Sequence, residues 1–235
     1  MGYSVSADLI PSNGPHKGFY PDGKVWVETN YANGKKNGPF KIYYENGQVD
    51  TEGTYNDGLI EGSVKKYYES GQIMTDGNFI HGKLEGELKA YYENGQISED
   101  RMYKNNQLEG LFKSYYDDGA IRSVTNYQNQ QADTTMYYRN GGVMNEIVRK
   151  NDECVSQKDY YENGKPKRIE TMEGFLDHIQ EYNEKGELTS DQKYKNINRM
   201  MGIKHQRRKI PERTGNLLQD MLNNNPFKEY KEYDR

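Results

Sequence analysis

One seven-residue segment recurs with a constant step of 24 residues, and this repetition constrains the fold more than any other feature of the sequence. The copies with the constant step are Tyr43–Val49, Tyr67–Ile73 and Tyr91–Ile97. Further copies begin one step earlier at Phe19 and one step later at Tyr115, and copies at Tyr137, Tyr160 and Tyr182 follow at spacings of 22 to 23 residues. Self-similarity at a fixed period is typical of repeat architectures, in which each unit packs mainly against its neighbours. We therefore count eight units, the last four looser than the first four.

Each unit carries the signature of a β-hairpin. An Asn-Gly or Asp-Gly pair between alternating apolar and polar residues is the strongest short-range signal for a two-residue type I′ turn, because both central residues need positive φ. With Ser70 and Gly71 as the turn, Tyr68 would lie opposite Ile73. The second turn of each unit, such as Asn56–Gly62, is predicted to be longer.

The alternation of side chains along these strands predicts one apolar and one charged face. Val64, Gly77 and Phe79 would share the apolar face. On the charged face, acids and lysines of successive strands would alternate in the order Glu28, Lys41, Glu52, Lys65, Asp76, Lys89 and Asp100. Exposed ion pairs contribute only roughly 0.2 to 1 kcal/mol each, so this ladder would mainly serve register and solubility.

These patterns predict an all-β protein: an elongated single-layer antiparallel sheet of about eight β-hairpins, followed by a short C-terminal helical cap or tail. Residues 1–18 would form an N-terminal lead-in, 19–195 the repeat array and 196–235 a basic, non-repeat tail. Within the tail, Thr214–Leu222 could form a short helix with its apolar residues along one side. The Gly-x-x-x-Gly element is lost from Gln128 onward, so the later units are expected to be distorted or differently curved.

Composition and charge narrow the classes of protein further. Only 33% of the 235 residues are apolar, which is little for a packed globule. Residues 1–195 carry 23 lysines and arginines against 31 acids, and residues 196–235 carry 9 against 5, so an acidic body precedes a basic tail. The single cysteine, Cys154, excludes an intramolecular disulfide framework.

No apolar stretch is long enough to span a membrane and no secretory signal is recognisable, so a cytoplasmic location is expected. Residues Met1–Ser6 fit the loose pattern for myristoylation of Gly2, which would anchor the chain to a membrane. A plain start of the chain explains the same residues more simply.

Catalytic and metal-binding motifs are missing from the sequence. The four histidines occupy unrelated repeat positions, and no spacing of His, Cys or Asp resembles a metal set. The acids recur in register, as scaffold residues do, and there is no Walker-type loop, nucleophile elbow or HExxH motif. We therefore expect a non-enzymatic protein with no cofactor, no metal and no small-molecule substrate.

Tyrosines and acids on the charged face are the candidate partner-binding residues, because exposed tyrosine offers contact area at small entropic cost. The tyrosines are Tyr43, Tyr67, Tyr91 and Tyr115, and the acids are Glu52, Asp76 and Asp100. Packing of these rings over lysine stems explains the same pattern equally well. The tail adds a basic patch with the candidates Lys204, Arg207 and Arg208. The alternative for the tail is a cap on the last unit.

The repeated segment resembles the MORN repeat, and in particular its bacterial variant. The resemblance covers roughly residues 19–195. It rests on the Tyr-Tyr-Glu-Asn-Gly-Gln-Ile segment, on an aromatic residue such as Tyr55 or Phe79, and on the glycine pairs Gly58–Gly62 and Gly82–Gly86. It implies a curved single-layer sheet. Bacterial proteins of this kind are commonly described as YwqK-like antitoxins or immunity proteins that bind a cognate toxin.

The leading expectation is thus a cytoplasmic, protein-binding antitoxin or immunity protein. Its acidic body would suit a basic toxin domain through complementary steering, and no nucleic acid is expected as a partner. Two alternatives stay open. A scaffold at a membrane surface would use the basic patch on anionic lipid. A carbohydrate-binding module would explain the Tyr-Gly repeats, although Trp26 is the single tryptophan.

Overall fold

The computed structural model describes residues 12–128, 131–150 and 153–196, and the regular structure in these residues is entirely β-strand. The strands are β1 (Gly14–Phe19), β2 (Val25–Ala32), β3 (Lys35–Lys36), β4 (Gly38–Tyr43), β5 (Val49–Asn56), β6 (Leu59–Ile60), β7 (Gly62–Tyr67), β8 (Ile73–Ile80), β9 (Lys83–Tyr91), β10 (Ile97–Lys104), β11 (Gln107–Tyr115), β12 (Ile121–Gln128), β13 (Gln131–Tyr137), β14 (Val143–Lys150), β15 (Glu153–Tyr160), β16 (Pro166–Glu173), β17 (Leu176–Tyr182) and β18 (Leu188–Lys195).

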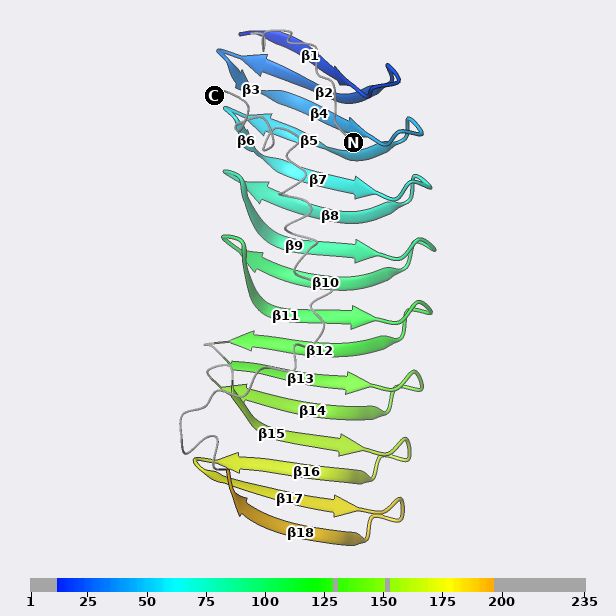
Figure 1. Cartoon of the computed structure of the whole chain (residues 1–235), viewed down its shortest axis with the longest axis vertical. Coiled ribbons are helices and arrows are strands. Elements are labelled where there is room, and N and C mark those ends of the chain that lie inside the picture. Colours follow the sequence, from blue (N-terminus) through cyan, green and yellow to red (C-terminus); the bar gives the residue numbers. More distant parts are fainter. Residues whose placement is uncertain (1–11, 129–130, 151–152, 197–235) are drawn as a thin grey trace. The chain divides into compact units, whose positions relative to one another are not determined.

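The strands pair antiparallel in chain order and form one open, single-layer sheet (Figure 1). β3 and β4 are two parts of one returning strand, and both pair with β2. In the same way, β6 and β7 are two parts of one returning strand, and both pair with β5. The predicted all-β, single-layer fold is confirmed. The helix predicted in the tail lies outside the described residues.

Eight hairpin turns of the Tyr-Gly type lie along one edge of the described sheet (Figure 1). In each turn the glycine N–H donates to the carbonyl three residues earlier, with N···O distances of 2.8–3.0 Å. The turns are centred at residues 20–23, 44–47, 68–71, 92–95, 116–119, 138–141, 161–164 and 183–186.

The type I′ prediction for these turns is wrong. Positive φ is confined to the glycine, as in Gly71 at 85°. The loop therefore has three residues: a type I turn followed by a left-handed glycine. Tyr67 rather than Tyr68 pairs with Ile73, because the register shifts by one residue beside the turn. The N–H of Tyr68 instead bonds the carbonyl of Gln72 at 2.8 Å and closes the loop.

The asparagine before the glycine has a different role from the one predicted. Its side-chain oxygen accepts the N–H of the residue two positions on, as Asn46 does from Gln48 at 2.8 Å and Asn94 from Gln96 at 3.0 Å. This Asx geometry satisfies a loop N–H without positive φ at the asparagine. The Asn-Gly pair thus selects the longer loop.

Type I′ turns occur at the opposite edge, where a longer connection was predicted. Both central residues have positive φ at Asp57 (50°) and Gly58 (88°), and Asn56 pairs directly with Leu59. The second glycine of the Gly-x-x-x-Gly element, Gly62, also has positive φ, at 82°. It lies where the returning strand is interrupted between β6 and β7. The element thus encodes a tight turn followed by a bulge.

The predicted register of the charged face is confirmed. In strand order, the opposed pairs are Glu28–Lys41, Lys41–Glu52, Glu52–Lys65, Lys65–Asp76, Asp76–Lys89, Lys89–Asp100 and Asp100–Lys113. Ion pairs close at Lys17–Glu28 (2.6 Å) and Lys41–Glu52 (3.2 Å). Lys89 contacts Glu87 of its own strand at 2.9 Å instead.

The opposite face holds the core, which is concentrated in the first four units. Val64, Phe79, Leu84 and Leu88 are at most 1% exposed. Large and small residues alternate across the strands, so that Gly53 lies between the side chains of its neighbours. A Cβ at Gly53 would approach both Phe40 and Val64 to 2.9 Å. The glycine thus makes room for the neighbouring core side chains.

The later units do differ from the earlier ones. β12 pairs with β13, and β16 with β17, without any register shift, because these units lack the bulged glycine. The buried positions of this half include Asn145 and Asp177, which are 7% and 4% exposed. The apolar face therefore becomes polar along the array.

We predict that Gly53→Ala destabilises the sheet by about 1 to 3 kcal/mol, because an added methyl group overpacks the space between Phe40 and Val64. Urea unfolding followed by circular dichroism measures the change. The neighbouring Thr54→Ala lies on the exposed face and should change stability by less than about 0.5 kcal/mol. Equal effects of the two substitutions would contradict this account of the core.

Candidate functional site

The first tyrosine of each pair lies on the charged face, as the pattern predicted. The hydroxyl of Tyr43 donates to Glu28 at 2.8 Å, and that of Tyr67 to Glu52 at 2.7 Å. Burial, followed by the bond to the carboxylate, raises the pKa of both Tyr43 and Tyr67 to about 12. Each ring is half-buried, and its polar end is already bound within the sheet.

Tyr91 and Tyr115 are also half-buried, but within the described residues neither hydroxyl bonds a carboxylate. The corresponding acids are aspartates, Asp76 and Asp100, whose side chains are one methylene shorter. Asp76 accepts the hydroxyl of Ser63 at 3.1 Å. Burial, with the nearby Glu87 as a smaller cause, raises the pKa of Asp100.

The polar and charged groups of the charged face therefore largely interact with one another. Its candidate acids, Glu52, Asp76 and Asp100, each lie opposite lysines on both neighbouring strands, which offset their charge. The structure brings Tyr67 together with Glu52 but gathers no larger constellation from the candidates. Lys204, Arg207 and Arg208 lie outside the described residues.

The second tyrosine of each pair forms a ladder that sequence reasoning missed. Each hydroxyl donates to the carbonyl of the first tyrosine in the next unit, at distances of 2.5–2.9 Å. The donors are Tyr20, Tyr44, Tyr68, Tyr92, Tyr116, Tyr138 and Tyr161. We call this set the tyrosine ladder. The strict recurrence of two adjacent tyrosines was the available signal for it.

The turn edge carries acids whose charge is not offset in the same way. Glu45, Glu69 and Glu93 are exposed at three successive turns, and no ion pair holds them within the described residues. With two strands per unit, successive turns lie roughly 9 to 10 Å apart. At the next turn Arg139 binds Asp117 and Asp118, at 2.8 and 2.7 Å. We call Glu45, Glu69 and Glu93 the acidic edge.

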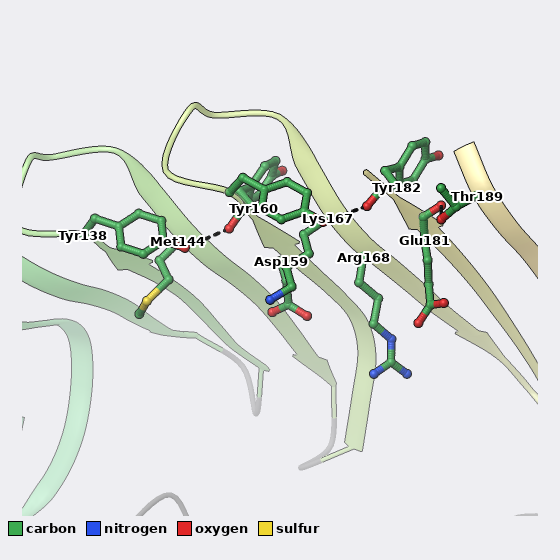
Figure 2. A pocket seen from close by; sticks show the side chains of 10 residues that line it. Tyr138, Met144, Asp159, Tyr160, Lys167, Arg168, Glu181, Tyr182 and Thr189 are labelled. Carbon is green, nitrogen blue, oxygen red and sulfur yellow. Dashed lines mark hydrogen bonds between the residues drawn. The ribbon is translucent and has the colours of Figure 1, made fainter. Parts of the chain in front are cut away.

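A shallow groove of about 590 Å³ lies on the other face, across the last three units. Figure 2 shows the side chains that line it, with the ladder residue Tyr138 above a row of Asp159, Arg168 and Glu181. The ladder residue Tyr161 also lines the groove. Lys167 also lines the groove, and its ammonium lies 5.7 Å from the Tyr161 ring centroid. This groove was not predicted from the sequence.

In the described ranges, no cluster of three or more His, Cys, Asp or Glu side chains could hold a metal ion. A search of the same ranges finds no helix long and apolar enough to cross a membrane.

The hairpins, their shared turns and the tyrosine ladder define a single-layer β-repeat protein. Six segments match the MORN repeat variant, at residues 12–33, 36–57, 60–81, 84–105, 108–129 and 155–173. These segments cover more than half of the 235 residues. The chain belongs to the MORN repeat variant family, whose repeats indicate a binding role.

Other comparisons add little. No curated protein matches the chain. Among solved structures, a chain in the "Crystal Structure of TcdB2-TccC3-Cdc42" resembles it at 10% identity with a TM-score of 0.17, over 74% of this chain and 13% of that one. A likeness this low carries no argument about function.

Removal of one ladder hydroxyl should loosen the joint between two units. Tyr68→Phe deletes the 2.7 Å bond to the carbonyl of Tyr91, and we expect a loss of about 1 to 2 kcal/mol because a half-buried acceptor loses its partner. Urea unfolding measures the loss. Tyr194→Phe is the control, since Tyr194 is 44% exposed and its hydroxyl makes no hydrogen bond within the described residues. A Tyr68→Phe protein as stable as the control would disprove a stabilising ladder.

The stability of the fold should decrease as the pH falls, because the glutamates of the charged face become protonated. A bond from Lys17 and then one from Tyr43 lower the pKa of Glu28, and a bond from Tyr67 and then one from Lys41 lower that of Glu52. A carboxyl with a lowered folded-state pKa stabilises the fold above its ordinary pKa, near 4.3, and loses this contribution as pH falls through the folded value.

The urea midpoint, measured between pH 7 and pH 3, should therefore fall less steeply in Glu52→Gln than in the wild type. Tyr67→Phe, which removes the largest cause of the shift at Glu52, should give an intermediate slope. Identical slopes in all three proteins would argue against this origin of acid sensitivity.

Proposed function

We propose that this protein acts by binding a cognate protein rather than by catalysis, and that it is an antitoxin or immunity protein that neutralises a basic toxin domain in the cytoplasm. The observation that carries the proposal is the uncompensated acidic edge on a MORN-variant array. Membership of the family leads us to expect a binding role, and the negative charge of the acidic edge leads us to expect a positively charged partner.

Electrostatics support a basic partner. Residues 1–195 carry eight more acids than bases, and on the charged face acids and lysines oppose one another. The excess charge is therefore most accessible where carboxylates form no ion pair within the described residues, at Glu45, Glu69 and Glu93. Their spacing of roughly 9 to 10 Å is close to the screening length of about 8 Å at physiological salt. A basic surface that spans several turns would meet all three carboxylates at once and be steered towards them.

The architecture suits inhibition by occlusion. A rigid open sheet presents a long surface without needing a pocket, as repeat proteins commonly do. An inhibitor that covers a toxin needs area and charge complementarity, and it needs no catalytic group.

Affinity capture of the full chain from its native cells, followed by mass spectrometry, tests the proposal. We expect one stoichiometric, basic protein whose expression arrests growth unless this chain is co-expressed. The triple substitution of Glu45, Glu69 and Glu93 by Gln should slow association about tenfold at low salt. Surface plasmon resonance at several salt concentrations measures this rate.

The matched control replaces three exposed lysines of the opposite edge, Lys35, Lys83 and Lys104, by Gln. It should leave association within about twofold of the wild type or accelerate it, because it makes the protein more acidic. Recovery of membrane components alone, or of a partner with no effect on growth, would refute the antitoxin proposal.

A further inference from the structure

The groove on the last three units is a departure from the repeat. Asp159 of β15 pairs with Arg168 of β16, and Arg168 pairs with Glu181 of β17, so the three side chains form one row across three strands. Figure 2 shows them extending in the same direction below the tyrosine rings. With adjacent strands about 4.8 Å apart, the row has the charge order negative, positive, negative.

In the earlier units the side chains of the corresponding row are buried. There it holds Ile42, Thr51, Thr75 and Ala90, each at most 8% exposed. Its one cation in these units, Lys66, forms an ion pair with Asp50 at 3.1 Å, and the two side chains are only 14% and 11% exposed. The earlier units therefore use this surface for their own packing.

At the two positions of that ion pair, the last units carry side chains of reversed charge that do not form an ion pair with each other. Lys167 occupies the repeat position of Asp50, and Glu181 that of Lys66. No ion pair joins Lys167 to Glu181 within the described residues, and Glu181 is exposed. The surface that is filled in the earlier units is thus an open groove here, in which Lys167 and Glu181 are not paired with each other.

A β-bulge concentrates positive charge at the centre of the groove. The register shift in β16 leaves Lys167 as the extra residue, so that Lys167 and Arg168 both line the groove although they are consecutive. The Nη2 of Arg168 bonds Glu170 at 2.9 Å, while its Nε finds no hydrogen-bond partner among the described residues. Asp159 and Glu181 flank this centre on the neighbouring strands.

We propose that this groove binds an extended polypeptide segment of the protein partner that carries an acidic side chain between two basic ones. The acidic side chain would meet Lys167 and Arg168, and the basic side chains would meet Asp159 and Glu181. The rings of Tyr138 and Tyr161 give the segment an aromatic wall. Cations already lie over rings of the tyrosine ladder, with Arg139 at 4.5 Å from the Tyr116 centroid. The inference rests on the proposed binding function, and it names a second contact site besides the acidic edge.

Two blocked pentapeptides of opposite charge order test the groove. In an extended chain, alternate side chains share one face, so Lys-Gly-Glu-Gly-Lys presents the complementary order and Glu-Gly-Lys-Gly-Glu the reverse. Isothermal titration of the full chain at 0.15 M salt should show at least tenfold tighter binding of the first peptide. Glu181→Gln and Arg168→Gln should each reduce this preference to less than about threefold.

Lys158→Gln is the matched control, because Lys158 lies on β15 with its side chain on the opposite face, 3.8 Å from Glu146. It should preserve the preference. Equal affinity for both peptides, or an equal effect of Lys158→Gln and Glu181→Gln, would overturn the groove as a binding site. Because Glu181 is exposed, its variant tests the groove even where Arg168→Gln fails to fold.

The outcomes also separate the two proposals. If the chain captures a basic toxin but shows no peptide preference, the proposed function is supported and the groove is refuted as a binding site. A chain with the predicted preference that captures no such toxin retains the groove and loses the antitoxin role.

Discussion

A single-layer sheet has no second layer to cover its faces, so each unit must be held by the unit beside it. In this protein the recurring bond between units, apart from the backbone pairing, runs from a tyrosine hydroxyl to the carbonyl of the first tyrosine in the next unit, at 2.5–2.9 Å. The bond fixes the turn edge of each hairpin against its neighbour. It persists from Tyr20 to Tyr161 although the unit length and the core residues change, so it is the constraint that the rest of the array shares.

The ladder leaves the two faces free to diverge along the chain. Early units fill one face with apolar residues and alternate large and small side chains, as around Gly53. At Arg101, which is 3% exposed and follows Gly53 and Gly77 in the repeat, a charged side chain takes the place of the core glycine. Such units can be tolerated because nearest-neighbour stacking distributes stability along the array. The later units have less apolar packing but retain the backbone pairing and the ladder.

Sequence periodicity predicted the fold class, the number of units and the register of the charged face, because a period of 24 residues and strict alternation leave few solutions. The turn types were exchanged between the two edges. An Asn-Gly pair is compatible with a type I′ turn, in which both residues have positive φ. It is equally compatible with the three-residue loop, which is stabilised when the asparagine oxygen accepts a nearby N–H. Only the three-dimensional structure distinguishes these two turns. The shift by one residue at Tyr67 follows from that loop.

The candidate site was predicted less well than the fold. The tyrosines and acids of the charged face were placed correctly, yet sequence alone could not show that the hydroxyls of Tyr43 and Tyr67 are bound by glutamates within the sheet. The groove escaped prediction because its residues come from five strands, and its cations become neighbours only through a bulge at Lys167.

Residues that keep the period serve the array, and residues that break it are available for other roles. The lysines and acids of the charged face oppose one another, and the core residues fill their own face. Asp159, Arg168 and Glu181 do neither, since they replace closed packing with separated charges in an open groove. Arg168 is already bonded to Glu170 at 2.9 Å and Glu181 is exposed, so the row is open to a second chain of complementary charge.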